Sequence, residues 1–158
     1  MKIKRDKRDA IFSLLIRERA NWSCQRCNRQ FERGAANLHC SHLFGRRHRA
    51  ARWASWGAVA HCAACHFYLT EHPLEFAAWV NGHFTPSKAE IYRRRSKIIA
   101  NFSKRELESI YKHLKAEHKS ILTWHQSGSG SGYPTNYYPF KDAPEISALR
   151  CIASCPPA

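Results

Sequence analysis

Two Cys-x-x-Cys pairs constrain the fold of this chain more than any other feature of its sequence. The first pair is Cys24 and Cys27, and the second is Cys62 and Cys65. Each pair can form a tight turn that sets two sulfur atoms on one side, and four thiolates suit a tetrahedral zinc ion. The spacing therefore predicts one structural zinc ion that closes the segment between the pairs into a loop. Free buried thiols are the alternative interpretation.

The rest of the sequence favours metal binding over disulfides for these pairs. It contains no apolar run long enough to span a membrane and no apolar stretch typical of a secretory signal. We therefore expect a cytoplasmic protein with reduced thiols and no membrane partner. A thiol redox role is a weaker alternative, because no β-α-β pattern surrounds the first pair. Cys151 and Cys155 have no partner pair nearby, so we interpret them as free thiols.

The charge balance predicts a polyanionic partner. Lysine and arginine together number 26 against 12 aspartate and glutamate residues, which gives a net charge of +14 at pH 7. The basic residues gather at the start of the first predicted helix, within 46–52 and within 93–97. Nucleic acid is the commonest partner for such a chain. A basic surface that only keeps the protein soluble is the alternative.

Apolar periodicity and turn signals predict a small α+β fold, in which a strand–loop–strand–helix unit is pinned by the metal and helices from both ends pack around it. The expected elements are a helix over residues 4–20, strands over 38–42 and 58–60, and helices over 65–71, 73–80, from 86 onward and from 104 to about 119. Ser103 and Glu106 have capping-box spacing, whereas the helix that contains Pro86 could be capped by Thr85 or by Ser87.

Changes in composition divide the chain into four segments. The predicted organisation is an N-terminal basic helix (1–22), a metal-bound core (23–72), a basic helical extension (73–125) and a flexible Ser/Gly then Pro-rich tail (126–158).

Two histidines beside the cysteine pairs are the candidate chemical groups. His42 ends the first predicted strand, and His66 directly follows Cys65, so the two rings could face each other. No Asp or Glu lies between Glu32 and Glu71. A catalytic metal on this loop would therefore use imidazoles, hydroxyls, water and substrate oxygens, and such donors favour transition ions over Mg²⁺. A neutral imidazole is a plausible base for activating water at neutral pH.

The alternatives without catalysis are that His42 is a strand histidine buried in the core and that His66 has no role in metal binding. His39 and His61 flank the motif, and we interpret both as structural or substrate-facing, although accessory metal binding is open to them. Cys40 has no Cys-x-x-Cys partner, so we interpret it as a packing residue.

The middle of the chain resembles the HNH endonucleases, which are also called His-Me finger or ββα-metal nucleases. The residues that carry the likeness are Ser41-His42-Leu43, then Arg46-Arg47, then the run from Ala58 to His66. The resemblance is to the phage-encoded subset with a four-cysteine zinc, and it is strongest over 24–66. It implies that His42 is the general base. It also implies that His66 binds a catalytic divalent metal (Mn²⁺, Ni²⁺ or Mg²⁺), with Ser41 as a candidate second ligand.

Two positions depart from the pattern of that family. Many members have Asp where this chain has Ser41, and the middle Asn of the motif corresponds to Gly57. The resemblance implies a metal-dependent DNA endonuclease of a bacterial or phage-infected cell, acting in phage-related DNA processing or recombination. The alternative is a zinc-stabilised DNA-binding protein with weak or no nuclease activity.

Seven arginines are predicted to contact DNA. They are Arg46, Arg47, Arg49, Arg52, Arg93, Arg94 and Arg95. Arg46 and Arg47 directly follow the predicted base, and their guanidinium forks could grip phosphate oxygens, although a solvated turn is the alternative. Trp53 and Trp56 lie within the same cluster and could pack in the core or contact DNA. A homodimer is a candidate assembly, because nucleases that cut both strands often need two sites.

Overall fold

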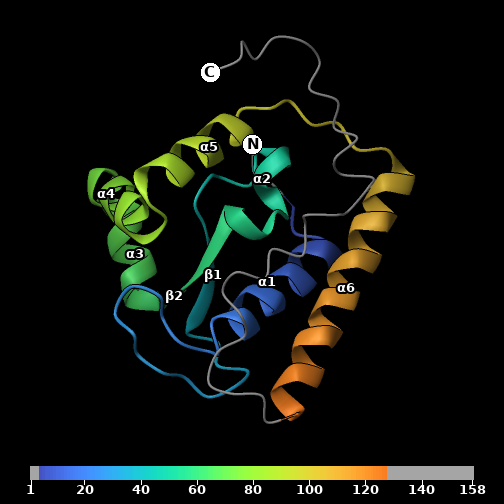
Figure 1. Cartoon of the computed structure of the whole chain (residues 1–158), viewed down its shortest axis with the longest axis horizontal. Coiled ribbons are helices and arrows are strands. Elements are labelled where there is room, and N and C mark those ends of the chain that lie inside the picture. The colour runs from blue at the N-terminus through green and yellow to red at the C-terminus, as the bar shows by residue number, and fades with distance from the viewer. Residues whose placement is uncertain (1–3, 128–158) are drawn as a thin grey trace.

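The computed structural model describes residues 4–127, in which six α-helices surround a two-stranded antiparallel sheet (Figure 1). The elements in chain order are α1 (Lys7–Arg19), β1 (Leu38–His42), α2 (Arg49–Arg52), the short 3₁₀ turn η1 (Ser55–Gly57), β2 (Ala58–Cys62), α3 (Ala63–Glu71), α4 (Pro73–His83), α5 (Pro86–Ser96) and α6 (Lys104–Gln126). This confirms the predicted α+β class. Most of the predicted tail, with Cys151 and Cys155, lies outside the described residues.

The sheet and α3 form the predicted strand–loop–strand–helix unit. β1 pairs with β2 so that Leu38 lies opposite Cys62 and His42 lies opposite Ala58. β2 is two residues longer than expected, because its pairing with β1 continues as far as Cys62. That residue is also the N-cap of α3, since its sulfur accepts the amide of Cys65 at 3.5 Å. The second cysteine pair is therefore fixed by the junction of a strand and a helix.

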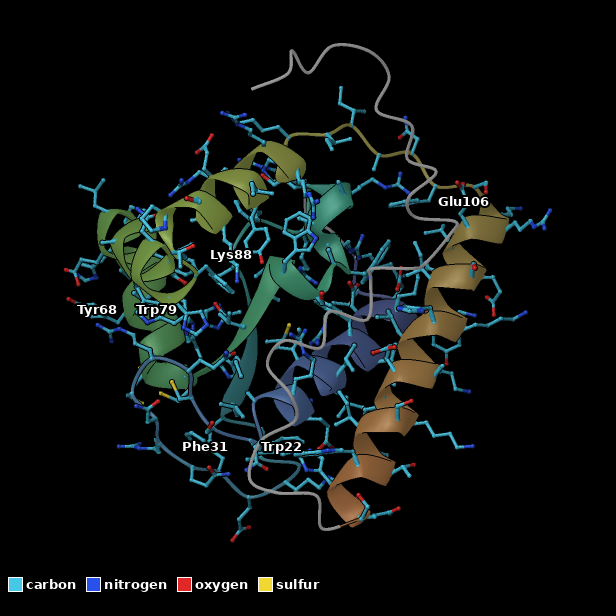
Figure 2. All side chains as sticks on the ribbon, in the orientation of Figure 1. Trp22, Phe31, Tyr68, Trp79, Lys88 and Glu106 are labelled. Atoms are coloured by element: carbon cyan, nitrogen blue, oxygen red, sulfur yellow. The ribbon has the colours of Figure 1, made fainter. Side chains whose placement is uncertain are left out.

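The long helix α6 packs along α1 (Figure 1). α1 begins one turn later than predicted because Asp6 caps it and forms a capping box with Asp9. α6 begins at the predicted capping box of Ser103 and Glu106, of which Glu106 is labelled near the upper end of the helix in Figure 2, and it continues beyond residue 119. The buried residues Phe12, Leu15, Leu38, Trp53, Ile110, Leu114 and Ile121 share one hydrophobic cluster. The terminal helices thus stabilise the sheet from one side.

Helix α4 packs against α3, and α5 packs against α4, α2 and η1. Pro73 occupies the first turn of α4, and Thr85 caps α5 by accepting the amide of Lys88 at 3.5 Å. The structure therefore selects Thr85 over Ser87 as the cap. Trp79 of α4, labelled in Figure 2, lies edge-on to His61 of β2 with 4.6 Å between ring centroids. None of the helices between residues 4 and 127 combines the length and apolar content that crossing a membrane requires.

Candidate functional site

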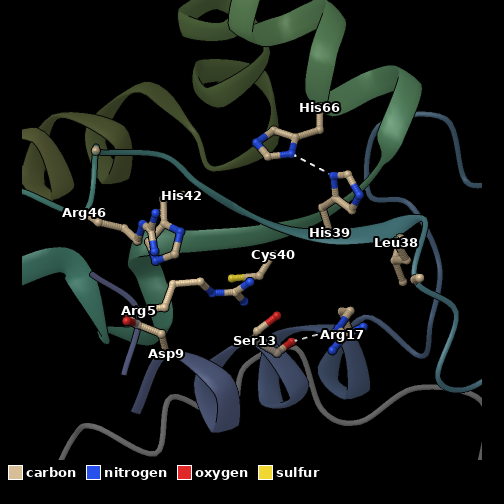
Figure 3. A pocket seen from close by; sticks show the side chains of 12 residues that line it. Arg5, Asp9, Ser13, Arg17, Leu38, His39, Cys40, His42, Arg46 and His66 are labelled. Atoms are coloured by element: carbon tan, nitrogen blue, oxygen red, sulfur yellow. Dashed lines mark hydrogen bonds between the residues drawn. The ribbon is translucent and has the colours of Figure 1, made fainter. Parts of the chain in front are cut away.

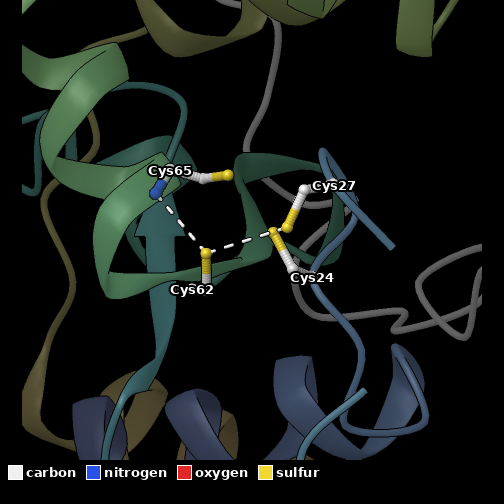
Figure 4. A group of neighbouring side chains, drawn as sticks. All are labelled: Cys24, Cys27, Cys62 and Cys65. Carbon is white, nitrogen blue, oxygen red and sulfur yellow. Dashed lines mark hydrogen bonds between the residues drawn. The ribbon is translucent and has the colours of Figure 1, made fainter. Parts of the chain in front are cut away.

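The two cysteine pairs meet in a cluster that could hold a metal ion (Figure 4). The sulfur atoms of Cys24, Cys27, Cys62 and Cys65 all lie within 4.8 Å of one another. All four are free cysteines, and Cys27 Sγ lies 3.9 Å from Cys62 Sγ, whereas a disulfide bond is about 2.05 Å long. The predicted convergence of the two pairs is thus present in the structure.

Gln25 fastens the first cysteine pair to the sheet. Its backbone N–H donates to the carbonyl of Ala60, and its side-chain oxygen accepts the amide of Ala60, both at 2.8 Å. These two bonds hold the turn that follows α1 against β2. They explain how pairs distant in the sequence lie together, and nothing in the Cys-x-x-Cys spacing indicated them.

The electrostatics of the cysteine cluster favour a bound cation. Burial opposes ionisation of Cys24, but backbone N–H groups near its sulfur, that of Cys27 first, lower the pKa of Cys24 to about 7. Burial raises the pKa of Cys65 to about 12, and the neighbouring sulfurs add to this effect. Arg26 donates to Cys65 Sγ at 3.7 Å and partly offsets it. Four thiolates this close repel one another, so a metal cation among them would stabilise the ionised form.

A pocket of about 650 Å³ lies between α1, β1 and α3 (Figure 3). Figure 3 shows His39 and His66 on one side of β1, and Arg5 and Arg17 on the α1 side. The residues that line the pocket are Arg5, Asp9, Ser13, Arg17, Ala36, Leu38, His39, Cys40, His42, Gly45, Arg46 and His66. The structure therefore brings both predicted catalytic histidines to one basic pocket. Cys40 packs at its edge against the core, as predicted.

The ring of His42 is oriented by the main chain of α2. His42 Nε2 lies 3.1 Å from the carbonyl oxygen of Arg52. A carbonyl oxygen can only accept, so Nε2 carries the proton and Nδ1 of the neutral ring is left as the proton acceptor. Burial lowers the pKa of His42 below its usual value, which keeps the ring neutral near pH 7. Its position against Phe12, at 5.8 Å between ring centroids, fixes the ring further.

His66 faces His39 in the structure. The two Nδ1 atoms are 3.1 Å apart, and the ring planes are 80° to each other. Both rings are half-buried and line the same pocket as His42. His39 was interpreted as structural or substrate-facing from the sequence. Its position beside His66 depends on the packing of α3 against β1, which the sequence alone does not state.

The structure does not bring Ser41 to the pocket. Ser41 is 1% exposed, and the pocket lining does not include it. Its place as a second metal ligand, expected from the resemblance, is therefore not supported by the geometry.

Gly57 is required by a close approach of the backbone. A Cβ atom at this position would lie 2.2 Å from the carbonyl oxygen of Ala51, which is an impossible distance. The Gly57 carbonyl accepts the amide of Leu43 at 2.9 Å, so the end of β1 is braced through the main chain. A motif asparagine would not fit in this arrangement of α2 and η1.

Arg52, which was predicted to contact DNA, is engaged in the structure by a carboxylate of the protein itself. Its guanidinium donates to both carboxylate oxygens of Asp9, at 3.0 and 2.6 Å, and its side chain is 11% exposed. Asp9 also accepts from Trp53 Nε1 at 3.0 Å. Density of basic residues in the sequence suggested a phosphate contact. The carboxylate that captures Arg52 comes from α1, which local sequence could not indicate.

The arginine-rich loop after β1 is joined to α5. His48 Nδ1 donates to the carbonyl of Ser96 at 3.1 Å, and Trp56 stacks on Tyr92 with 5.3 Å between ring centroids. Trp53 is buried, so both tryptophans of the loop are packing residues in this structure. The first predicted arginine cluster therefore lies on α2 and on the turn before it, next to α5, which carries the second cluster.

The arginines of these two elements differ in their exposure. Arg47, Arg94 and Arg95 are exposed. Arg93 donates to Asn81 and Glu90, and Arg94 also donates to Glu90. The guanidinium of Arg49 lies 5.4 Å from the ring centroid of Phe102, and Arg46 lines the pocket. The exposed members are the candidates for contact with an external anion.

The fold and the site together define a small α+β protein with a four-cysteine cluster able to hold a metal ion and a basic pocket lined by histidines. No protein-family model, curated protein or solved structure matches this chain.

Proposed function

We propose that this protein is a metal-dependent DNA endonuclease of the HNH type, with His42 as the general base. The single observation that carries this proposal is the setting of His42. Its Nε2 is held by the Arg52 carbonyl, which leaves Nδ1 as acceptor in a pocket lined by three arginines and two further histidines. A neutral, oriented imidazole is the usual general base at neutral pH.

The residues of the pocket divide the chemistry between them. His42 Nδ1 takes a proton from the attacking water molecule. Arg5, Arg17 and Arg46 attract the phosphodiester and neutralise its charge. His66 holds a divalent metal ion, which when bound stabilises negative charge on the leaving oxygen.

The four-cysteine cluster is proposed to bind structural zinc. Four sulfur donors suit zinc, and soft thiolates select it over magnesium or calcium. The cluster anchors β2 and the first turn of α3, which carry Cys62, Cys65 and His66. Loss of the ion is therefore expected to disturb the pocket as well as the cluster.

The exposed arginines of the two clusters are proposed to hold the DNA backbone. Arg47 lies in the turn before α2, and Arg94 and Arg95 lie on α5, which packs against α2. Each phosphate contact should add close to one unit to the slope of log affinity against log salt concentration, roughly 0.9 per contact for duplex DNA. Such contacts carry no sequence preference.

A DNA-binding protein without turnover is the second candidate function. Two observations favour it, namely the burial of Ser41 outside the pocket lining and the absence of space for a motif asparagine at position 57. This function would use the same basic surface and the same cysteine cluster. It differs from the nuclease only in the absence of cleavage.

Nicking of supercoiled plasmid separates the two functions. Zinc-loaded protein would be incubated with Mn²⁺, Ni²⁺ or Mg²⁺, in the wild type, His42→Gln and the control His72→Ala. His72 is exposed and lies outside the pocket, so its loss should have no effect on cleavage. Glutamine can still donate to the Arg52 carbonyl but is not basic. We expect His42→Gln to slow nicking by about 10²–10⁴-fold, the usual contribution of a general base.

Zinc content and DNA affinity should be unchanged in His42→Gln. Equal nicking by the variant and the wild type would exclude His42 as the base. Tight DNA binding without metal-dependent nicking by the wild type would establish the second function instead.

A further inference from the structure

The two Nδ1 atoms of His39 and His66 are 3.1 Å apart, on rings that are nearly perpendicular. Two imidazole nitrogens approach this closely when they share either a proton or a metal ion. A proton shared between two neutral rings needs one particular pair of tautomers. A metal ion needs both nitrogens to be free of protons and to point at one centre.

The distance fits a chelated ion. Imidazole nitrogens bind zinc-like dications at about 2.0–2.1 Å, so two ligands at tetrahedral or octahedral angles lie about 2.8–3.4 Å apart. The observed separation of 3.1 Å falls within this range.

Both histidines stand on rigid parts of the structure. His39 lies in the middle of the paired segment of β1, opposite His61. His66 lies in the first turn of α3, directly after Cys65 of the cysteine cluster. Ligands placed on paired strands and anchored helices keep their geometry better than ligands on loops.

The neighbourhood supplies nitrogen donors and little free carboxylate. The carboxylate that lines the pocket is Asp9, and both of its oxygens accept from Arg52, with Trp53 and the Asp6 amide as further donors. Two imidazoles, with water and a phosphate oxygen in the remaining positions, suit Mn²⁺, Co²⁺, Ni²⁺ or Zn²⁺ better than Mg²⁺.

We propose that His39 and His66 together bind one divalent transition-metal ion through their Nδ1 atoms. His39 therefore takes the place of Ser41 as the second protein ligand. The role of this ion in catalysis depends on the proposed endonuclease function, whereas its binding by the two histidines does not.

Metal binding by the full chain tests this assignment directly. Zinc-loaded protein is titrated with Co²⁺ and, separately, with Mg²⁺ by calorimetry, and zinc content is measured afterwards to exclude exchange at the cysteines. The variants are His39→Ala and His66→Ala, with His72→Ala as the matched control. We expect one Co²⁺ per chain in addition to zinc. We expect His39→Ala and His66→Ala each to weaken Co²⁺ binding by at least about tenfold. Loss of a residue that only supports a metal ligand already weakens metal binding by about 10–100-fold.

X-ray absorption of the Co²⁺-loaded wild type gives a second readout that needs no variant. It should show two imidazole ligands on cobalt and no sulfur. Absence of the additional Co²⁺, a single imidazole, or wild-type Co²⁺ affinity in His39→Ala would each overturn the proposal and leave a shared proton as the reason for the short contact.

The outcomes also separate this proposal from the endonuclease. Co²⁺ bound by both histidines in a protein that never nicks DNA would sustain the metal site and refute the enzyme. Undiminished nicking by His39→Ala, with nicking lost in His42→Gln, would sustain the enzyme and refute His39 as a ligand.

Discussion

Replacement of Gly57 is the sharpest test of how the loop between the strands is packed. A Cβ atom at this position would meet the carbonyl oxygen of Ala51 at 2.2 Å and its carbonyl carbon at 3.1 Å, whereas ordinary contacts begin near 3.4 Å. The opposing atoms belong to the backbone of α2, and Ala51 is fully buried, so a rotamer change cannot relieve the clash. The whole of α2 would have to move.

The cost follows from this geometry. Added volume in a packed interior costs about 1–3 kcal/mol, and a rigid backbone partner places Gly57→Ala at the upper end, about 3 kcal/mol. For a chain of this size about 2–4 °C of melting temperature corresponds to each kcal/mol, which predicts a decrease of about 6–12 °C. Gly57→Asn should reduce the free energy of unfolding by at least as much. It should not increase nicking, because the hydrogen bond from Leu43 to the Gly57 carbonyl shifts when α2 moves.

Thermal unfolding followed by circular dichroism, with zinc in excess, measures the effect. Gly82→Ala is the matched control, since Gly82 lies within α4 and nothing is within 4 Å of its added Cβ. Alanine should stabilise that helix by about 0.5–1 kcal/mol. A melting temperature of Gly57→Ala equal to that of the wild type would refute the close packing of α2 against η1.

Three further predictions address the ion pair, the cysteines and the DNA surface. Asp9→Asn leaves Arg52 buried without its partner and should cost about 3–5 kcal/mol in urea unfolding. Although burial opposes ionisation, Arg52 holds the pKa of Asp9 below its ordinary 3.8, so the stabilisation is complete above pH 3.8 and disappears as the pH falls through the folded-state pKa. Acid unfolding curves should therefore lose this contribution in Asp9→Asn, and an unchanged curve would argue against the pair. Cys62→Ser, or a strong chelator, should remove zinc measured by atomic absorption and unfold the β2–α3 junction, whereas Cys40→Ser should retain the ion. Arg95→Ala should reduce the salt dependence of DNA binding by about one unit with no change in sequence preference, and an unchanged slope would exclude a phosphate contact.

Local signals in the sequence predicted the elements that local interactions determine. The capping box of Ser103 and Glu106 located the start of α6, and the cysteine spacing indicated a common cluster. The unit of two strands and a helix followed from periodicity and from the cysteines at its end. The short elements α2 and η1 were missed, because an arginine-rich segment of this length has no apolar periodicity to reveal a helix.

The parts of the pocket that depend on tertiary contacts could not be predicted. Asp9 lies within the predicted first helix, yet nothing in that segment indicated that it pairs with Arg52, which is distant in the sequence. The density of charge around Arg52 pointed to DNA, whereas in the structure its guanidinium binds Asp9. The position of His39 beside His66 could not be predicted, because the sequence does not state which helix covers that face of the sheet. The register with His61 and the position of α3 decide that it meets His66.

In the proposed endonuclease, His42 removes a proton from water during cleavage of DNA. The most direct measurement is the rate of Mn²⁺-dependent plasmid nicking by wild type and His42→Gln proteins with equal zinc content and equal DNA affinity. If His42 is the general base, the wild type should nick rapidly and His42→Gln should show almost no nicking. Equal rates, or no nicking by either protein with any of the three ions, would contradict it.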